Sequence, residues 1–350
     1  MKAAMWYGRK DIRIVDAPLP ELPPGHVLIR VAWAGICGTD RHEYTGPNFI
    51  PVTKPHRLTG RTAPLILGHE FAGIIAETGP GVEHWRRGDR VTANGTLSCG
   101  ACEACRRGRY NICEKLGFVG VSRDGAFAEY VSIEAARLFP VPPGLSLRHA
   151  VLAEPLACGL HAARLLGDIS GRDVAVVGPG VIGLACFFAS REAGAGRILV
   201  AGMGNARREL VESCGGVYVD AGAENLREAV RARFGGAADI AYECVGLQSS
   251  LDSCLDILKP SGALMVMGVY EKPPVFRMND FQEGERRLFT SQAHVDEIAP
   301  ALGLLAGGAV DAERLITGEV TLDTLVRNGF EELLAHGEAH IKVLIRIGGE

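Results

Sequence analysis

The chain has 350 residues, is 47% hydrophobic and carries a formal net charge of −4 at pH 7. This length allows two domains with ample cores, and the slightly acidic balance gives no general electrostatic footprint for nucleic acid. No apolar run reaches the roughly 18 residues of a membrane span, and the opening MKAAMWYGRK lacks the apolar stretch of a signal peptide. We therefore expect a cytoplasmic protein with neither a membrane nor a nucleic-acid partner.

The first 150 residues predict short strands separated by Gly and Pro turns. Strand composition marks residues 26–36, 70–79 and 126–133. The stretches LPPG and PPG supply turn signals between the strands. This half of the chain is therefore expected to be β-rich.

A cysteine cluster follows within this half, in the stretch CGACEACRRGRYNIC. Disulfides need an oxidising compartment, whereas clustered thiols in reducing cytosol more often bind metal. Four thiolates at this C-x2-C-x2-C-x7-C spacing can converge on one tetrahedral zinc and leave no open position, so the zinc should be structural. Four unrelated buried thiols remain the alternative. The expected ligands are Cys99, Cys102, Cys105 and Cys113.

After about residue 152 the pattern changes to alternating strands and helices. Strands are expected at 174–177, 197–202, 238–246 and 262–270, with helical stretches between them. This alternation predicts a parallel sheet with right-handed crossovers. The last strand, in 340–349, has no place in the alternation and could rejoin the first domain.

A glycine turn joins the first of these strands to a helix, in VAVVGPGVIGLA. Gly178 permits a tight turn, Gly180 lets the backbone approach a pyrophosphate, and Gly183 allows close helix packing. Val181 and Ile182 open the helix, whose N-terminus offers unpaired N–H groups to phosphates. This context favours a dinucleotide site over a plain strand-to-helix turn.

The second strand of this unit ends at Gly202, where an acid would normally bind the adenosine ribose. Glycine there removes the acceptor and is expected to leave space for the 2′-phosphate of NADP. Asn205, Arg207 and Arg208 follow closely, and a nearby Arg can accommodate that phosphate. We therefore expect NADP in preference to NAD, and expect Gly202→Asp to shift the preference toward NAD. Val245 and Val269 are further expected cofactor contacts.

Three further fragments carry metal-ligand side chains: GICGTDRHEY, LGHEFAG and LAEPLACGLHA. Taken alone, none of these fragments indicates a metal site, because a single Cys is usually part of a core and a single His or Glu usually lies on the surface. Together with the cysteine cluster and the glycine turn, they resemble the zinc-containing medium-chain dehydrogenases, the alcohol, sorbitol, threonine and butanediol dehydrogenase group. The resemblance runs from residue 1 to about residue 348, with the motifs in the same order.

The resemblance implies an α/β fold, with a GroES-like β-rich catalytic domain and a doubly wound Rossmann cofactor domain. The catalytic domain is expected at 1–152 and 295–350, with a structural zinc lobe at 95–115, and the cofactor domain at 153–294. Such a protein would hold two zinc ions per chain and a nicotinamide cofactor, and would assemble as a homotetramer, with a homodimer as the alternative.

The resemblance also implies roles for residues of the second zinc site. Cys37 and His69 match zinc ligands of the family. The third ligand of ordinary alcohol dehydrogenases is a Cys, but Glu154 in EPL matches the polyol and butanediol pattern, with Cys158 as a rival. The remaining implied roles are a near-zinc carboxylate at Glu70, which can enter the coordination shell as an alternate ligand, a carboxylate at Asp40 that orients the imidazole, and a proton relay through Thr39 and His42.

The segment between Cys37 and His69 resembles the butanediol branch through GPNFIP, PHRLTG and AP. A vicinal diol or its hydroxyketone, 2,3-butanediol and acetoin, is therefore the expected substrate pair. A sugar alcohol of the sorbitol type, or another secondary alcohol, is the alternative. A zinc-stabilised nucleotide-binding protein without catalysis and a zinc-ribbon nucleic-acid module are less favoured, because the residues for catalysis are all present and the charge is acidic.

Overall fold

The computed structural model describes residues 1–46 and 49–349 and divides into two compact units. The first unit comprises 1–154 and 298–350, and the second comprises 155–297. The divisions fall after 154 and 297, whereas the sequence placed them after 152 and 294. Pro47 and Asn48 of GPNFIP, and Glu350 at the end of the expected catalytic domain, lie outside the described residues.

Antiparallel pairing dominates the first unit. A three-stranded sheet has the order β2-β1-β4, a larger sheet has the order β10-β6-β5-β3-β18-β17 with β9 also on β3, and β7 pairs with β8. The strands are β1 (Lys2–Gly8), β2 (Asp11–Asp16), β3 (His26–Gly35), β4 (Leu65–Ile66), β5 (Glu70–Thr78), β6 (Arg90–Ala93), β7 (Thr96–Leu97), β8 (Gly117–Phe118), β9 (Tyr130–Glu134), β10 (Leu138–Pro140), β17 (Ile316–Thr321) and β18 (Lys342–Arg346).

The strand expected from residue 126 begins only at Tyr130. The reason is local, because the amides of Ala126 and Phe127 donate to the carbonyls of Gly68 and Leu67, at 3.0 and 2.9 Å. These residues therefore brace the turn before β5 instead of extending β9.

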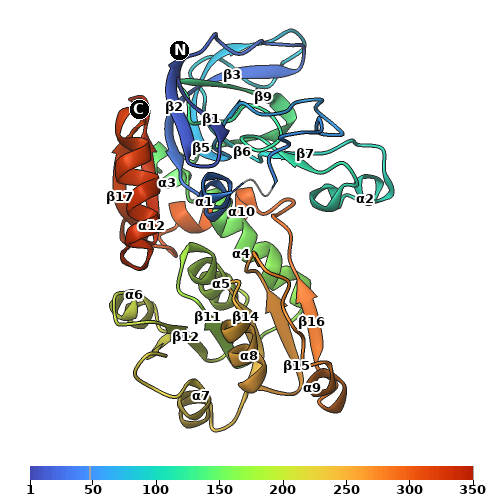
Figure 1. The fold of residues 1–350 in the computed structure, drawn as a ribbon, viewed down its shortest axis with the longest axis vertical. Helices are drawn as coiled ribbons and strands as arrows, with labels where there is room; N and C mark the ends of the chain where they lie inside the picture. Colours follow the sequence, from blue (N-terminus) through green and yellow to red (C-terminus); the bar gives the residue numbers. More distant parts are fainter. Residues whose placement is uncertain (47–48, 350) are drawn as a thin grey trace. The chain divides into compact units, whose positions relative to one another are not determined.

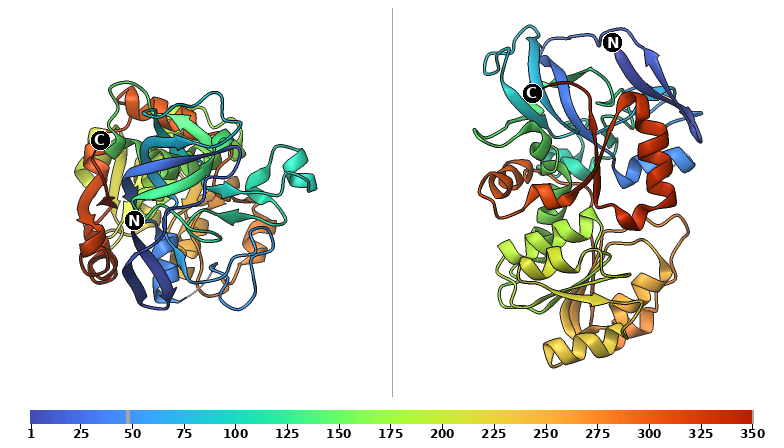
Figure 2. Two further views of the ribbon diagram at one scale, coloured as in Figure 1. Left: turned by 90° about the horizontal axis from the view of Figure 1, so that it is seen from above. Right: turned by 90° about the vertical axis from the view of Figure 1, so that its left-hand side faces the viewer.

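The C-terminal strand β18 belongs to the first unit. Its Leu344 pairs with Gly35 of β3 in antiparallel register, and β17 lies parallel on its other side. Figure 2 shows this red strand beside the blue strand β3. The expectation that the last strand rejoins the first domain is therefore confirmed.

Short helices connect the strands of the first unit around a core that includes Trp6, Phe71, Phe127 and Phe330. The helices are α1 (Gly38–Thr45), α2 (Glu103–Arg106), α3 (Leu147–Ala150), α10 (Ile298–Ala306), α11 (Ala312–Leu315) and α12 (Glu332–Ala335), and the tighter or wider turns are η1 (Tyr110–Ile112), η2 (Ala135–Arg137), η3 (Leu322–Thr324), η4 (Leu325–Glu331) and η5 (Gly337–Ala339).

The second unit is a parallel six-stranded sheet with flanking helices, as the alternation predicted (Figure 1). The order β13-β12-β11-β14-β15-β16 reverses direction at β11, where dinucleotides bind in such sheets. Its strands are β11 (Val174–Val177), β12 (Ile198–Gly202), β13 (Val217–Asp220), β14 (Ala238–Glu243), β15 (Leu258–Val266) and β16 (Arg287–Thr290). Its helices are α4 (Ala153–Leu166), which starts in the last residues of the first unit, α5 (Val181–Glu192), α6 (Arg208–Ser213), α7 (Leu226–Phe234), α8 (Gln248–Asp256) and α9 (Met278–Glu283).

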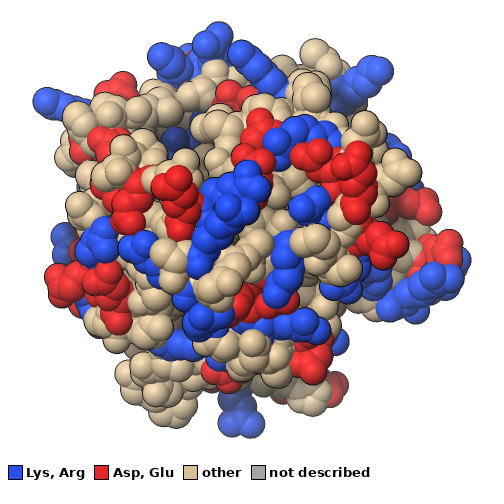
Figure 3. Space-filling view, turned by 90° about the horizontal axis from the view of Figure 1, so that it is seen from below, with Lys and Arg blue, Asp and Glu red and all other residues tan. Residues whose placement is uncertain are grey.

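Among the described residues, no helix combines the length and the apolar character that crossing a membrane would require. On the face of the molecule shown in Figure 3, Lys and Arg side chains are interspersed with Asp and Glu side chains.

Candidate active site and metal centres

The four cysteines of the zinc lobe converge on one point. Their sulfurs all lie within 4.8 Å of one another, and the measured Sγ–Sγ distances run from 3.4 to 4.0 Å. A tetrahedral zinc with Zn–S bonds of about 2.3 Å needs S–S edges of about 3.8 Å. All ten cysteines of the chain lie in the described residues and are free of disulfides. The donor set therefore fits zinc.

Backbone amides surround the same sulfurs. The amides of Cys99 and Lys115 donate to Cys113 Sγ at 3.3 Å, and the amide of Cys102 donates to Cys99 Sγ at 3.3 Å. Hydrogen bonds from backbone amides lower the pKa of Cys102 to about 6. Such a thiol deprotonates easily, and the thiolate is the form that binds metal.

A second group of possible metal ligands lies between α1 and the start of β5. Ligand atoms of Cys37, His69 and Glu70 lie within 4.8 Å of one another. Cys37 caps α1, and its amide donates to Asp40 Oδ2 at 2.9 Å. His69 follows Gly68, which has a φ of 99°. A Cβ at Gly68 would lie 2.3 Å from Phe127 Cδ1, so only glycine fits at this position.

Asp40 faces the His69 ring. Asp40 Oδ1 lies 3.8 Å from His69 Nδ1, and neither atom has a hydrogen-bond partner among the described residues. This arrangement directs Nδ1 to a carboxylate and leaves Nε2 for a metal. Burial alone would lower the pKa of His69, but the neighbouring Cys37 and Asp40 raise it overall, so metal binding would displace a proton.

Glu70 forms a buried ion pair with Lys342, a residue that the sequence reasoning missed. Lys342 at the start of β18 donates to Glu70 Oε1 and Oε2 at 2.7 and 2.6 Å, and to the Ile36 carbonyl at 3.1 Å. Both side chains are 1% exposed. Glu70 also requires glycine at position 35, where a Cβ would lie 2.2 Å from Oε2. Both carboxylate oxygens are thus bound by the ammonium group.

Replacing Lys342 by Met should lower the free energy of unfolding by about 3–5 kcal/mol, because it leaves the buried Glu70 charge without a partner. Chemical denaturation would measure the loss. Lys2→Met is the matched control, because it breaks an exposed pair with Asp323 and should leave stability unchanged. A loss no larger than that of the control would contradict the buried-pair assignment, and Glu70→Leu combined with Lys342→Met should recover most of the loss.

The other expected active-site residues occupy two helices. Thr39 and His42 are half-buried on α1, three positions apart and therefore on one face. Glu154 lies in the first turn of α4 and is absent from the group of mutually close ligand atoms. Burial would lower the pKa values of His69 and Lys342; Cys37 and Asp40 raise that of His69, Glu70 and Cys37 raise that of Lys342, and the charge of Glu154 adds a smaller contribution to each. Cys158 is half-buried one turn further along α4.

The glycine turn of the second unit has the tight turn expected at Gly178 and the close packing expected at Gly183. Gly178 has a φ of 102°, and a Cβ at Gly183 would lie 1.8 Å from the Gly178 carbonyl oxygen. A Cβ at Gly180, by contrast, would meet nothing within 4 Å. Gly180 is also the N-cap of α5, so open space lies at the helix N-terminus, where a pyrophosphate fits.

The expectation that Gly202 leaves space is wrong. A Cβ at Gly202 would lie 2.4 Å from Pro179 Cγ and 2.5 Å from the Tyr218 hydroxyl oxygen. Glycine is therefore required here by the packing of the turn against β12. Gly202→Asp would displace Pro179 or Tyr218, so it cannot serve as a test of cofactor preference.

The guanidinium group of Arg208 is hydrogen-bonded to other groups of the protein. Its guanidinium donates to Asn205 Oδ1 at 2.9 Å, to Glu212 Oε1 at 3.0 Å and to the Tyr218 carbonyl at 3.2 Å. Arg207 is 8% exposed, and burial lowers its pKa. Asp220 at the end of β13 binds the amides of Gly204 and Gly222 at 2.9 and 3.0 Å. Asn205 itself is exposed.

Val245 and Val269 follow β14 and β15 at the same edge of the sheet as the glycine turn. They are 43% and 41% exposed. A Cβ at Gly178 would lie 2.6 Å from Val245 Cγ2, so Val245 borders the turn. The structure therefore brings both valines to the carboxyl edge, where dinucleotides bind.

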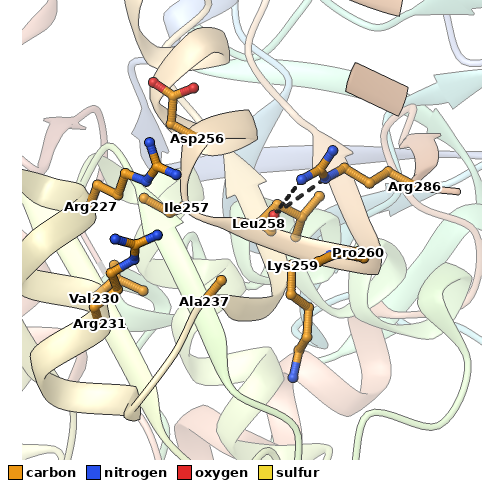
Figure 4. Close-up of a pocket in the computed structure, with 10 residues that line it drawn as sticks. All are labelled: Arg227, Val230, Arg231, Ala237, Asp256, Ile257, Leu258, Lys259, Pro260 and Arg286. Carbon is orange, nitrogen blue, oxygen red and sulfur yellow. Dashed lines mark hydrogen bonds between the residues drawn. The ribbon is translucent and has the colours of Figure 1, made fainter. Parts of the chain in front are cut away.

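A cavity of about 160 Å³ lies at the opposite, amino-terminal edge of this sheet (Figure 4). Arg286 donates to the Leu258 carbonyl there, at 3.0 Å from Nη2, and Asp256 pairs with Arg277 at 2.7 Å. The cavity is distant along the strands from the glycine turn and is not the dinucleotide site. Its lining residues are Arg227, Val230, Arg231, Ala237, Asp256, Ile257, Leu258, Lys259, Pro260 and Arg286.

Comparisons with known proteins agree with this geometry. Residues 23–143 match the alcohol dehydrogenase GroES-like domain, and residues 181–307 match the zinc-binding dehydrogenase domain. The chain is 36% identical to (R,R)-butanediol dehydrogenase of Bacillus subtilis (strain 168) over 99% of both chains. It is 31% identical to sorbitol dehydrogenase of the same organism over 99% of this chain and 97% of that protein. A crystal structure described as a zinc-binding dehydrogenase from Sinorhizobium meliloti 1021 bound to NADP is 31% identical, with a TM-score of 0.87 over 99% of this chain and 98% of that one.

Proposed function

This chain belongs to the zinc-dependent medium-chain dehydrogenase family, and we propose that it interconverts a vicinal diol and its hydroxyketone, 2,3-butanediol and acetoin. The observation that carries the proposal is the convergence of the Cys37 and His69 ligand atoms beside Glu70, in a chain 36% identical along its length to a butanediol dehydrogenase. Oxidation of a sugar alcohol is the second candidate, because a sorbitol dehydrogenase is 31% identical over nearly the same length.

Cys37, His69 and Glu154 would hold the catalytic zinc, and Cys99, Cys102, Cys105 and Cys113 the structural one. When bound, the catalytic zinc supplies a Lewis acid that lowers the pKa of the substrate hydroxyl. Glu70 would stay outside this ligand set, because both of its oxygens accept hydrogen bonds from Lys342. A role for Glu70 as a ligand would require breaking this buried ion pair, which favours Glu154 as the third ligand.

The chain's own residues would manage the proton. Asp40 would hold the His69 ring in one orientation, since its Oδ1 faces Nδ1. Thr39 would receive the hydroxyl proton of the substrate and pass it toward His42, whose imidazole can accept and release a proton. In the reverse direction the same two side chains would return a proton to the product oxygen.

The turn of Gly178, Gly180 and Gly183 would bind the pyrophosphate of the cofactor, whose nicotinamide accepts the hydride. We propose NADP as the preferred form. The supporting observations are the glycine at the end of β12, where NAD-binding sheets carry an acid, and the 31% identical structure bound to NADP. Asn205, Arg207 and Arg208 are the cofactor-specificity residues of the proposal.

Steady-state kinetics should give a higher kcat/KM with NADP than with NAD. Asn205→Asp should shift the ratio toward NAD by roughly tenfold, because a carboxylate on this exposed position repels the 2′-phosphate. Gln282→Glu is the matched control, since it adds the same charge at an exposed position of α9 and should leave the ratio unchanged. A wild-type enzyme with a higher kcat/KM for NAD would overturn the NADP assignment.

The substrate assignment is tested by a scan of alcohols with both cofactors. 2,3-Butanediol should give the highest kcat/KM, followed by other secondary alcohols. Higher values for sorbitol or related sugar alcohols would instead support the second candidate. We further propose a cytoplasmic location, in keeping with the ten free cysteines, and a homotetrameric assembly.

A further inference from the structure

Glu243 is a fully buried carboxylate at the carboxyl end of β14. It is 0% exposed, and its Oε1 accepts hydrogen bonds from the amides of Val245 and Gly246, both at 2.9 Å. The Ser250 hydroxyl donates to the same oxygen at 2.6 Å. All three groups donate to this one oxygen, which is the role that a carboxylate oxygen can fill.

The charge of Glu243 has no counter-ion. Within residues 1–46 and 49–349 it makes no ion pair, and its buried Oε2 has no donor at full hydrogen-bond geometry, with the Tyr270 hydroxyl as its polar neighbour. The buried Tyr270 hydroxyl lies beside this carboxylate, and burial, then the charge of Glu243 and a hydrogen-bonding interaction with it, raise the pKa of Tyr270. The electrostatic field of a buried carboxylate without a counter-ion is only weakly screened, so it affects the energy of nearby charges.

Two loops are packed around this carboxylate. The Glu243 carbonyl accepts from the amides of Met267 and Gly268 at 2.8 and 3.1 Å. A Cβ at Gly268 would lie 2.5 Å from Glu243 Oε2, and a Cβ at Gly246 would lie 2.4 Å from the Val269 carbonyl oxygen. The side chain of Glu243 therefore touches the segment after β15 as well as the segment after β14.

These two segments carry Val245 and Val269 at the carboxyl edge. In a sheet of this order, the first half, β11 to β13, takes the adenosine side of a dinucleotide. The second half, β14 to β16, then takes the nicotinamide nucleotide. Glu243 thus supports the part of the unit that receives the nicotinamide, which is a cation when oxidised and neutral when reduced.

We propose that Glu243 is a positioning residue that fixes the two nicotinamide-binding loops, and that its charge favours the oxidised cofactor over the reduced one. The inference rests on the proposed dinucleotide binding. The oxidised ring is attracted by the uncompensated carboxylate, whereas the reduced ring gains nothing from it. Glu243 would thereby bias the enzyme toward the form that starts alcohol oxidation.

The test is calorimetric titration of the full-length protein with NADP⁺, NADPH and 2′,5′-ADP, which lacks the nicotinamide. Glu243→Gln preserves size and hydrogen bonding at Oε1 while removing the charge. We expect Kd for NADP⁺ to rise about three- to tenfold, with Kd for NADPH within about twofold and Kd for 2′,5′-ADP unchanged. Equal changes for NADP⁺ and NADPH, or no change for either, would overturn the charge effect.

Two further variants separate charge from loop geometry. Ser250→Ala removes the hydroxyl that bonds Glu243 and the Leu247 backbone but keeps the charge, so the NADP⁺ to NADPH ratio of Kd should stay at the wild-type value. If Glu243→Gln does not fold, Tyr270→Lys compared with Tyr270→Phe places an ammonium group beside the carboxylate and should shift the ratio against NADP⁺. An unshifted ratio would overturn the inference. A wild-type protein that binds none of the three probes would instead contradict the proposed function.

Discussion

Replacing Glu154 by Ala should reduce turnover by more than about 100-fold while leaving the fold and cofactor binding intact. Loss of a residue that only supports a metal ligand costs up to about 100-fold, and loss of a ligand should cost more. The charge of Glu154 adds a small contribution to the raised pKa values of His69 and Lys342, whose larger causes are Cys37 and Asp40 for His69 and Glu70 for Lys342. Steady-state kinetics, metal analysis and cofactor titration would measure the three effects.

Cys158→Ser is the matched control, because Cys158 lies one turn further along α4 and is the rival ligand. It should retain turnover and zinc content close to the wild type. If Cys158→Ser lost activity and Glu154→Ala did not, Cys158 would be the ligand and the butanediol-branch assignment would be contradicted.

Replacing Cys113 by Ser should remove the structural zinc and unfold the lobe that it organises. Cys113 is buried and accepts two amide hydrogen bonds in addition to its place in the cluster. Structural zinc sites contribute apparent binding free energies of roughly 10–16 kcal/mol, so loss of one ligand should exceed the effect of most single substitutions. Thermal denaturation and metal analysis would show a lower Tm and one zinc fewer per chain.

Cys214→Ser provides the comparison, since Cys214 is a half-buried thiol outside the four-sulfur group. It should leave the Tm and the zinc content unchanged. A Cys113→Ser protein with full zinc content and wild-type Tm would contradict the structural role of the cluster.

The features that the sequence predicted are local ones. The cysteine spacing places four sulfurs together within one short loop, and the glycine turn joins consecutive elements, so neither depends on distant contacts. The alternation of strands and helices likewise defined the parallel sheet, because crossovers in such sheets have one hand. Gly68 could have been recognised from the same kind of local signal, a glycine directly before a ligand.

The features that escaped prediction depend on packing between distant segments. Lys342 meets Glu70 across 272 residues of sequence, and an isolated Lys in an apolar strand gives no sign of its partner. Gly202 was interpreted as a gap, yet Pro179 and Tyr218 fill the space beside it. The ion pair of Arg208 with Glu212, one turn away on α6, was not anticipated either. The role of Glu243 required knowing that two loops close around its side chain.

The central proposal is that a labile zinc, bound by Cys37, His69 and Glu154, is required for nicotinamide-linked diol oxidation. The direct test measures zinc per chain and the rate of NADPH formation from 2,3-butanediol during stepwise mild chelation. The initial protein should hold two zinc ions, and removal of the first should abolish activity while the four-thiolate zinc stays bound. Returning zinc should restore the rate. Fully active protein with one zinc or none would contradict the account.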